Sequence, residues 1–428
     1  MLFALLITGI IFYFYHIFVG RSLDTATYGV FGALFSLSYF LQFILFRAVN
    51  VMVARSMSKF KGQNNLQLIP LFHSKMLLYI SAGGIASLVI FSLLSGKIAN
   101  FLHVDSIILV LFIGVLFLLC WILPVNLGTM QGLQRFNQLA FMRILTPAMK
   151  LLFGVGLMFM GFGIYGAIGG LVIGAIIALI VSFYLLRDII RLPSLRTNSQ
   201  SISTTTPEST SDHDHLHFLA HDINFEIKEA FRFLSPILFA IVCLAIPTNI
   251  DVIFVKHFFT AEDAGLFTAV TVFGRMSLSV PLAITIIMYP KAVEAHTKNN
   301  ETRGLLKRSL LYTGIPTGLL AILFFIIPKS ILGILYGTEY LEAESLLKLY
   351  GIFIFFFSLT IVLVYNSLAK NRYGFVYLFS ALSLLELVLI WLYHDSLILV
   401  LQIFLIMSVI SFVIGFFINY SYPRINKI

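Results

Sequence analysis

Twelve long apolar runs constrain this sequence more than any other feature. Each has about 20 residues, the length at which an α-helix crosses the hydrocarbon core of a bilayer. Of the 428 residues, 59% are hydrophobic and 11% are charged, whereas a soluble domain has about 25% charged residues. We therefore predict an all-α integral membrane protein with about twelve transmembrane helices. The expected spans are residues 1–19, 30–50, 76–95, 106–128, 144–162, 164–186, 234–254, 266–288, 309–327, 345–366, 374–393 and 397–419.

Two of these runs predict further detail. The fifth and sixth are separated only by the stretch Gly161–Gly170, which predicts a tight helical hairpin. The first run lacks a basic leading stretch and a small-residue cleavage site, so we interpret it as a retained helix and not as a signal peptide.

Basic residues are concentrated in alternate connecting segments. By the positive-inside rule those segments are cytoplasmic, and both termini lie on the same side. The net charge of +9 is thus a topology signal, and nothing in its distribution indicates nucleic acid. The opposite segments hold only Arg21, Lys97, Lys256 and Lys329. The basic set comprises Arg55, Lys59, Lys61, Lys75, Arg135, Arg143, Arg187, Arg191, Arg196, Lys228, Arg232, Lys291, Lys298, Arg303, Lys307, Arg308, Lys370, Arg372, Arg424 and Lys427.

The chain repeats itself at a distance of 236 residues. The stretch Phe18–Phe35, "FVGRSLDTATYGVFGALF", aligns without a gap with Phe254–Thr271, "FVKHFFTAEDAGLFTAVT". Residues of the connecting segment match as well as apolar ones, including Gly29 with Gly265. The alternative is that apolar sequences resemble one another through composition alone.

The repeat predicts two bundles of six helices with the same orientation in the membrane. An even number of spans returns the chain to the side from which it started, so the repeat is parallel, with its axis along the membrane normal. Two such bundles flank a central cavity and can rock against each other. The expected divisions are 1–190 for the first bundle, 191–230 for a cytoplasmic linker and 231–428 for the second bundle.

The linker has a Ser/Thr-rich part and a His/Asp-rich part. The first has no apolar residues to bury, which predicts disorder. The second could bind a transition metal, but its spacing fits no standard site and a solvated charged stretch is preferred. Residues 216–234 have apolar residues at helical spacing, which predicts an amphipathic helix on the membrane surface. Cys120 and Cys243 lie in apolar runs and indicate neither disulfide nor metal, so we expect no cofactor.

Several stretches together resemble a known family. They are "VARSMSKFKGQ" (Val53–Gln63), "QGLQRFNQLAF" (Gln131–Phe141), "FRFLSPIL" (Phe231–Leu238), "NIDVIFV" (Asn249–Val255) and "MYPKAVEAH" (Met288–His296). In order and spacing the chain resembles the polysaccharide transporter family of lipid-linked oligosaccharide flippases, within the superfamily that also holds multidrug extruders and lipid II flippases. It departs from many relatives in its short start, its twelve spans and its long linker. The resemblance implies a bacterial or archaeal plasma-membrane protein, a monomer, whose partners are membrane lipid, its lipid-linked substrate and polysaccharide biosynthesis enzymes.

Polar residues inside the spans are the candidates for a binding site, because charge at mid-bilayer is costly. The resemblance implies that spans one, two, seven and eight line the central cavity. On these spans we expect Arg47, Asn50, Asn249 and Arg275 to bind substrate, and Asp251, His16 and Gln42 to serve ion coupling or gating.

Each assignment has a structural alternative. Arg47 could be an anchor at the membrane surface, Arg275 could form a fixed ion pair, and Asp251 could be a solvated helix-end residue. We also expect that Asp251 pairs with Arg275 when the site is empty. Lys150 and Glu386 occupy similar positions in the two halves, where a structural or lipid-groove role is preferred.

These observations favour a non-enzymatic transporter. The leading hypothesis is a flippase that moves a polyprenyl-diphosphate-linked oligosaccharide to the outer leaflet, because arginines suit phosphate oxygens. The alternative is a multidrug or metabolite exporter of the same fold, driven by proton or sodium exchange. A membrane-bound polymerase or glycosyltransferase is less favoured, because every predicted outer loop is short and no nucleotide-binding glycine loop occurs.

Overall fold

The computed structural model describes residues 2–190, 227, 241–242, 244–297, 303–370 and 372–421, and the regular elements within these ranges are all helical. A first group of helices comprises α1 (Leu2–Ser22), α2 (Thr25–Gly62), α3 (Leu68–Phe101), α4 (Ile107–Gly132), α5 (Phe136–Leu157), α6 (Gly163–Leu185) and the short α7 (Arg187–Ile190). A second group comprises a helix over residues 244–258, α9 (Ala261–Arg275), α10 (Ser279–Thr297), α11 (Arg303–Ile326), α12 (Pro328–Leu335), α13 (Glu344–Ala369), α14 (Tyr373–Leu392) and α15 (Leu397–Ser421).

Nine helical segments in the described part of the chain are long and apolar enough to cross a membrane, against twelve predicted. The nine do not include α1 or the helix over 244–258. They count α5 and α6 together, as one segment over Phe136–Leu185. The multi-pass character is thus supported, and the count of twelve stays a prediction.

Several helices are longer than the apolar runs that predict them. The second span was expected over 30–50, but α2 has 38 residues and is roughly 57 Å long at 1.5 Å per residue. It begins after Asp24, whose carboxylate accepts a hydrogen bond of 2.9 Å from the Thr27 backbone N–H. Hydrogen bonding from the Thr27 side chain, and then from its backbone, lowers the pKa of Asp24. The apolar run measures only the section within lipid, about 30 Å thick, whereas the helix continues into the basic segment that follows.

The predicted hairpin of the fifth and sixth spans is confirmed. The chain reverses at Gly161 and Gly163, which have positive φ angles of 90° and 49°, and α5 and α6 pack along their length. Gly166, Gly170 and Gly174 recur every four residues on α6 and face α5 so closely that a Cβ on Gly170 would lie 2.2 Å from the Gly154 Cα. Small residues at this spacing let two membrane helices approach at backbone distance.

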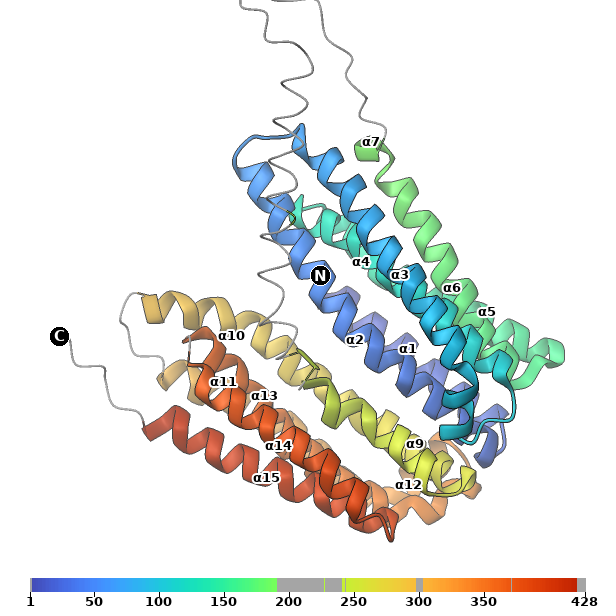
Figure 1. Ribbon diagram of the computed structural model, residues 1–428. Helices are drawn as coiled ribbons and strands as arrows, with labels where there is room; N and C mark the ends of the chain where they lie inside the picture. Colours follow the sequence, from blue (N-terminus) through green and yellow to red (C-terminus); the bar gives the residue numbers. More distant parts are fainter. Residues whose placement is uncertain are drawn as a thin grey trace, which may run out of the picture.

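The two groups of helices lie side by side and diverge toward one end (Figure 1). They are close at the end where α1 finishes and α2 and α9 begin, which we call the closed end. They are apart where α2 and α10 finish, which we call the open end. The principal contact between the groups is that of α2 with α9. If the basic segments are cytoplasmic as predicted, the open end faces the cytoplasm.

The α2–α9 contact is made by the two stretches that align in the predicted repeat. A Cβ on Gly29 would lie 2.1 Å from the Ala261 carbonyl oxygen, and a Cβ on Gly265 would lie 2.0 Å from the Thr25 carbonyl oxygen. Under the 236-residue shift Thr25 corresponds to Ala261 and Gly29 to Gly265, so the two contacts are equivalent. Such reciprocal contacts are the pattern that a two-fold axis produces. Both glycines are required because no side chain fits between the backbones.

Contacts between the end of α1 and the segment after α11 also join the groups at the closed end. The Tyr340 hydroxyl donates a hydrogen bond of 2.9 Å to the Gly20 carbonyl. The Arg21 guanidinium donates one of 2.7 Å to the Ile334 carbonyl. The closed end is therefore sealed by backbone packing and by side-chain hydrogen bonds.

Some predictions concern residues that the structure does not describe. The Ser/Thr-rich linker, its His/Asp-rich part and Cys243 lie outside the described residues, as does the predicted amphipathic helix apart from Ile227. Within the described ranges no group of three or more His, Cys, Asp or Glu side chains could hold a metal ion.

Substituting Gly29 with alanine should open the closed end. Overpacking of this kind costs about 1–3 kcal/mol, and each 1.4 kcal/mol changes an equilibrium about tenfold. We expect Gly29→Ala to raise the labelling rate of a cysteine at the buried position 264 (Ala264→Cys, in a background without Cys120 and Cys243) about tenfold with a membrane-impermeant maleimide.

The matched control is Gly96→Ala on α3, because a Cβ there meets nothing within 4 Å. Equal labelling in the two variants would contradict the role of Gly29 in closing this end.

Candidate functional site

A buried ion pair joins the helix over 244–258 to α9. The Arg275 guanidinium donates a hydrogen bond of 2.5 Å to the Asp251 carboxylate, and the side chains are only 11% and 1% exposed. The other Asp251 oxygen is buried without a hydrogen-bond partner among the described residues. The expected pairing of Asp251 with Arg275 is thus present, and the solvated helix-end alternative for Asp251 is wrong because its side chain is buried.

The eighth predicted span is interrupted directly after Arg275. Residues Met276–Leu278 form a 3-10 turn between α9 and α10. Pro281 has no N–H to donate to the Ser277 carbonyl four residues earlier, which explains the interruption. A 3-10 stretch within a long helix often marks a hinge, and here it lies beside the ion pair.

His16 is fully buried among aromatic rings. Its ring centroid lies 4.4 Å from that of Phe35 and 4.7 Å from that of Phe12. Neither ring nitrogen has a hydrogen-bond partner among the described residues. His16 therefore belongs to the packed interface of α1 with α2.

The two expected asparagines pack locally. Asn249 donates a hydrogen bond of 3.0 Å to the Ala245 carbonyl of its own helix. Asn50 is buried in the second half of α2, where its backbone carbonyl faces Gly128 of α4 and its side-chain nitrogen has no hydrogen-bond partner among the described residues. Neither residue lines the cavity described next.

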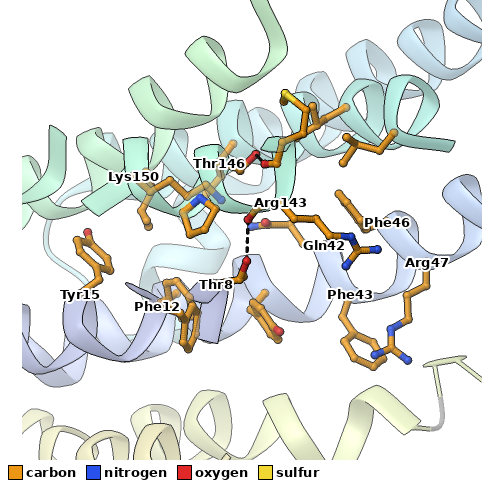
Figure 2. Close-up of a pocket in the computed structure, with 18 residues that line it drawn as sticks. Thr8, Phe12, Tyr15, Gln42, Phe43, Phe46, Arg47, Arg143, Thr146 and Lys150 are labelled. Atoms are coloured by element: carbon orange, nitrogen blue, oxygen red, sulfur yellow. Dashed lines mark hydrogen bonds between the residues drawn. The ribbon is translucent and has the colours of Figure 1, made fainter. Parts of the chain in front are cut away.

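A cavity of about 300 Å³ lies inside the first group of helices (Figure 2). Of the expected residues it is lined by Gln42 and Arg47, and it lies within one group rather than between the two. The remaining lining residues come from five helices: Thr8, Phe12 and Tyr15 of α1; Phe35, Tyr39, Phe43 and Phe46 of α2; Leu116, Leu123 and Leu127 of α4; Met142, Arg143, Thr146, Pro147 and Lys150 of α5; and Leu171 of α6.

Three basic side chains line this cavity, and none of its eighteen lining residues is Asp or Glu. Figure 2 shows Arg143 and Arg47 toward one end and Lys150 nearer the end formed by Tyr15. Arg47 also reaches the second group, where it donates a hydrogen bond of 3.2 Å to the Tyr365 hydroxyl, and its guanidinium lies 4.2 Å from the Phe43 ring. Positive charge without acidic counter-charge at this depth is costly, by about 2.5–3.5 kcal/mol per residue on translocon scales, and its location favours an anionic ligand.

The sequence interpretation did not assign Arg143 and Lys150 to a site. Arg143 was counted among the cytoplasmic charges, and Lys150 was given a structural or lipid-groove role. The sequence does indicate that these residues lie together, because positions 143, 146, 147 and 150 follow the pattern i, i+3, i+4, i+7 and so share one helix face. Glu386, which occupies a position similar to that of Lys150 in the other half, is buried in α14. One of its oxygens has no hydrogen-bond partner within the described ranges.

Comparison with known proteins identifies the fold. A multidrug resistance MATE family transporter in an inward-facing conformation superposes with a TM-score of 0.75 at 11% identity, covering 97% of this chain and 96% of that one. The lipid II flippase MurJ in an inward closed conformation superposes with a TM-score of 0.71 at 14% identity, covering 98% and 87%. An outward-facing MATE structure gives 0.64 at 12% identity, covering 97% and 93%.

The chain has the fold shared by MATE transporters and MurJ. No family model and no curated protein matches it. At these identities the likeness establishes the fold alone, so the function must be argued from the site. The higher score with the inward-facing MATE structure agrees with helices that meet at one end and diverge at the other.

Removing one partner of the buried ion pair should destabilise the protein. Asp251→Asn leaves Arg275 charged and uncompensated, which costs about 3–5 kcal/mol for a buried pair. The measurement is the thermal unfolding midpoint in detergent, which should fall markedly. The double variant Asp251→Leu, Arg275→Met should recover most of the loss.

The matched control is Asp188→Asn. Asp188 is 55% exposed and pairs with Arg135, which holds the pKa of Asp188 below its usual range. Exposed pairs contribute about 0–1 kcal/mol, so this variant should unfold near the wild-type temperature. Equal effects of the two substitutions would contradict a structural role for the buried pair.

Proposed function

We propose that this protein is a membrane transporter that flips a polyprenyl-diphosphate-linked oligosaccharide from the cytoplasmic to the outer leaflet by alternating access. The observation that carries the proposal is Arg47, a cation that lines a cavity without acidic lining residues and reaches the second group through Tyr365. A lipid-linked sugar diphosphate carries charge that must pass the apolar core, and fixed cations offset the cost of removing it from water. The fold shared with MurJ, a lipid II flippase by its description, supports the same proposal.

The proposal includes a two-bundle architecture in the plasma membrane. It has twelve spans, with the first bundle over 1–190, a cytoplasmic linker over 191–230 and the second bundle over 231–428, and both termini in the cytoplasm. The reciprocal contacts of Gly29 and Gly265 support a two-fold relation between the bundles. The protein acts as a monomer, within membrane lipid, and receives its substrate from polysaccharide biosynthesis enzymes.

Arg47 is the residue that we assign to the diphosphate. It lies where the cavity of the first group meets the second group, because it lines the cavity and also bonds Tyr365 of α13. A guanidinium at this place can contact a head group between the bundles while the lipid tail stays in the membrane. Asp251 holds Arg275 in the empty state, and a diphosphate that draws Arg275 away would loosen the second group beside the turn at Met276–Leu278.

An exporter of the same fold is the second candidate, and the MATE likeness favours it. An exporter of organic cations needs acidic groups in its cavity. The lining residues here are basic, neutral or aromatic, so the chemistry of the cavity favours the flippase.

Replacing Arg47 should slow flipping. In liposomes that contain a fluorescent polyprenyl-diphosphate oligosaccharide, Arg47→Gln should lower the rate of transfer between leaflets about tenfold or more, because a hydrogen bond to a charged group contributes about 1.5–3 kcal/mol. Tyr365→Phe removes the bond between the groups but keeps the charge, and should retain most of the activity.

The matched control is Arg187→Gln, since Arg187 lies on α7, over the Tyr184 ring and away from the cavity. Wild-type flipping by Arg47→Gln would contradict the role of Arg47. Wild-type protein that moves no lipid-linked sugar, but exchanges an organic cation for protons, would support the exporter instead.

A further inference from the structure

Two of the three cations lie well inside the first group of helices. Arg143 and Lys150 are seven residues apart on one face of α5, with Thr146 and Pro147 between them on the same face. Lys150 is 14 residues from the start of α5, or roughly 21 Å along the axis, and lies within the predicted fifth span of residues 144–162. Arg143 and Lys150 thus hold positive charge in the interior of one bundle, behind Arg47 rather than beside the second group.

The second group has other residue types at the positions that correspond to these cavity residues. Under the 236-residue shift, the cavity residues Tyr15, Tyr39 and Lys150 correspond to Asp251, Arg275 and Glu386. In the second group Asp251 and Arg275 neutralise each other. In the first group the equivalent positions line a cavity with three basic side chains and no acidic lining residue.

The other residues that line the cavity suit a sugar ring. Phe12, Phe35, Tyr39, Phe43 and Phe46 supply aromatic surface, and Thr8, Gln42 and Thr146 supply neutral polar groups. Aromatic faces stack on the C–H faces of sugar rings, and a few polar groups among apolar ones are typical of small-ligand sites. The Arg143 Nε is buried without a hydrogen-bond partner among the described residues, so the guanidinium keeps a donor unused.

We propose that this cavity binds an acidic sugar of the transported glycan, a sugar ring that carries a carboxylate or a phosphate. Arg143 and Lys150 bind the acid, and the aromatic residues of α1 and α2 bind the ring. The diphosphate is a poorer partner for Arg143 and Lys150, because it is joined directly to a lipid tail that must remain in the membrane, whereas these two residues line a cavity among α1, α2, α4, α5 and α6. The inference rests on the proposed function and adds a substrate class to it.

The experiment compares two lipid-linked glycans that differ in one sugar, glucuronate in one and glucose in the other. In liposomes, Lys150→Met should slow flipping of the acidic glycan about tenfold and change that of the neutral glycan less than about twofold. Arg143→Gln should likewise slow flipping of the acidic glycan and leave that of the neutral glycan nearly unchanged. Lys150→Arg, which keeps the charge, should keep the wild-type ratio of the two flipping rates. The control is Lys97→Met, at the far end of α3 and outside the cavity.

A binding measurement separates this inference from the proposed function. Calorimetric titration of the purified protein with free glucuronate, glucose phosphate and glucose should give binding of the two acids, weakened about tenfold in Lys150→Met, and none of glucose. Such binding supports the inference even if wild-type protein flips neither lipid, which would refute only the proposed function. If glucose phosphate alone binds, the acid recognised is a phosphate; if glucuronate binds as well, a carboxylate suffices.

Three results would overturn the inference. One is an equal slowing of both glycans by Lys150→Met, which would assign Lys150 to the shared diphosphate or to folding. Another is flipping of both glycans by Lys150→Met and Arg143→Gln at the wild-type rate. The last is acid binding that is absent from the wild type or unchanged in both variants.

Discussion

The backbone contact of α2 with α9 is the constraint on which the rest of this structure depends. Gly29 and Gly265 let the two helices touch without intervening side chains, and they do so at one end only. From that crossing the two groups of helices diverge, as Figure 1 shows. Because α2 continues for 38 residues, its far half carries Arg47 to the place where the cavity of the first group approaches α13. A bulkier residue at either glycine would change the angle that sets this geometry.

The Asp251–Arg275 pair of the second group and the cavity cations of the first group differ in how their buried charge is offset. In the second group an aspartate and an arginine from neighbouring helices satisfy each other, so the cost of burying them is offset locally. In the first group a comparable depth holds two cations on α5 and a third on α2 with no carboxylate among the lining residues. The positions that the 236-residue shift aligns thus carry different chemistry in the two groups.

The sequence predicted the helical class, the α5–α6 hairpin and the Asp251–Arg275 pair. Each depends on local information: apolar length, a run of glycines between two spans, and two opposite charges in neighbouring spans. It did not predict how far α2 extends, because hydropathy marks only the section within lipid. The interruption of the eighth span after Arg275 was not predicted from the sequence either, although Pro281 indicates it.

The cavity could not be predicted in the same way. Its wall is formed by five helices, and which faces converge depends on how α1, α2, α4, α5 and α6 pack. The predicted fifth span begins at residue 144, so the sequence places Arg143 in the preceding loop. In the structure α5 begins at Phe136, and Arg143 lies within the helix. His16, Asn50 and Asn249 are predicted at the site because they are polar residues on spans that the resemblance places at the central cavity, but none of the three lines the cavity described here.

The separation of Gly29 from Gly265 along the chain has a consequence for biogenesis. The helices that surround the cavity all lie within the first 185 residues, so they can assemble while the remainder is still being synthesised. Their partner surface on α9 emerges from the ribosome more than 230 residues after Gly29. Until then the glycine face of α2 must be covered by lipid or by an insertion factor. The closed end can form only after α9 and Tyr340 have been synthesised, whereas a half-made chain already contains the complete cavity.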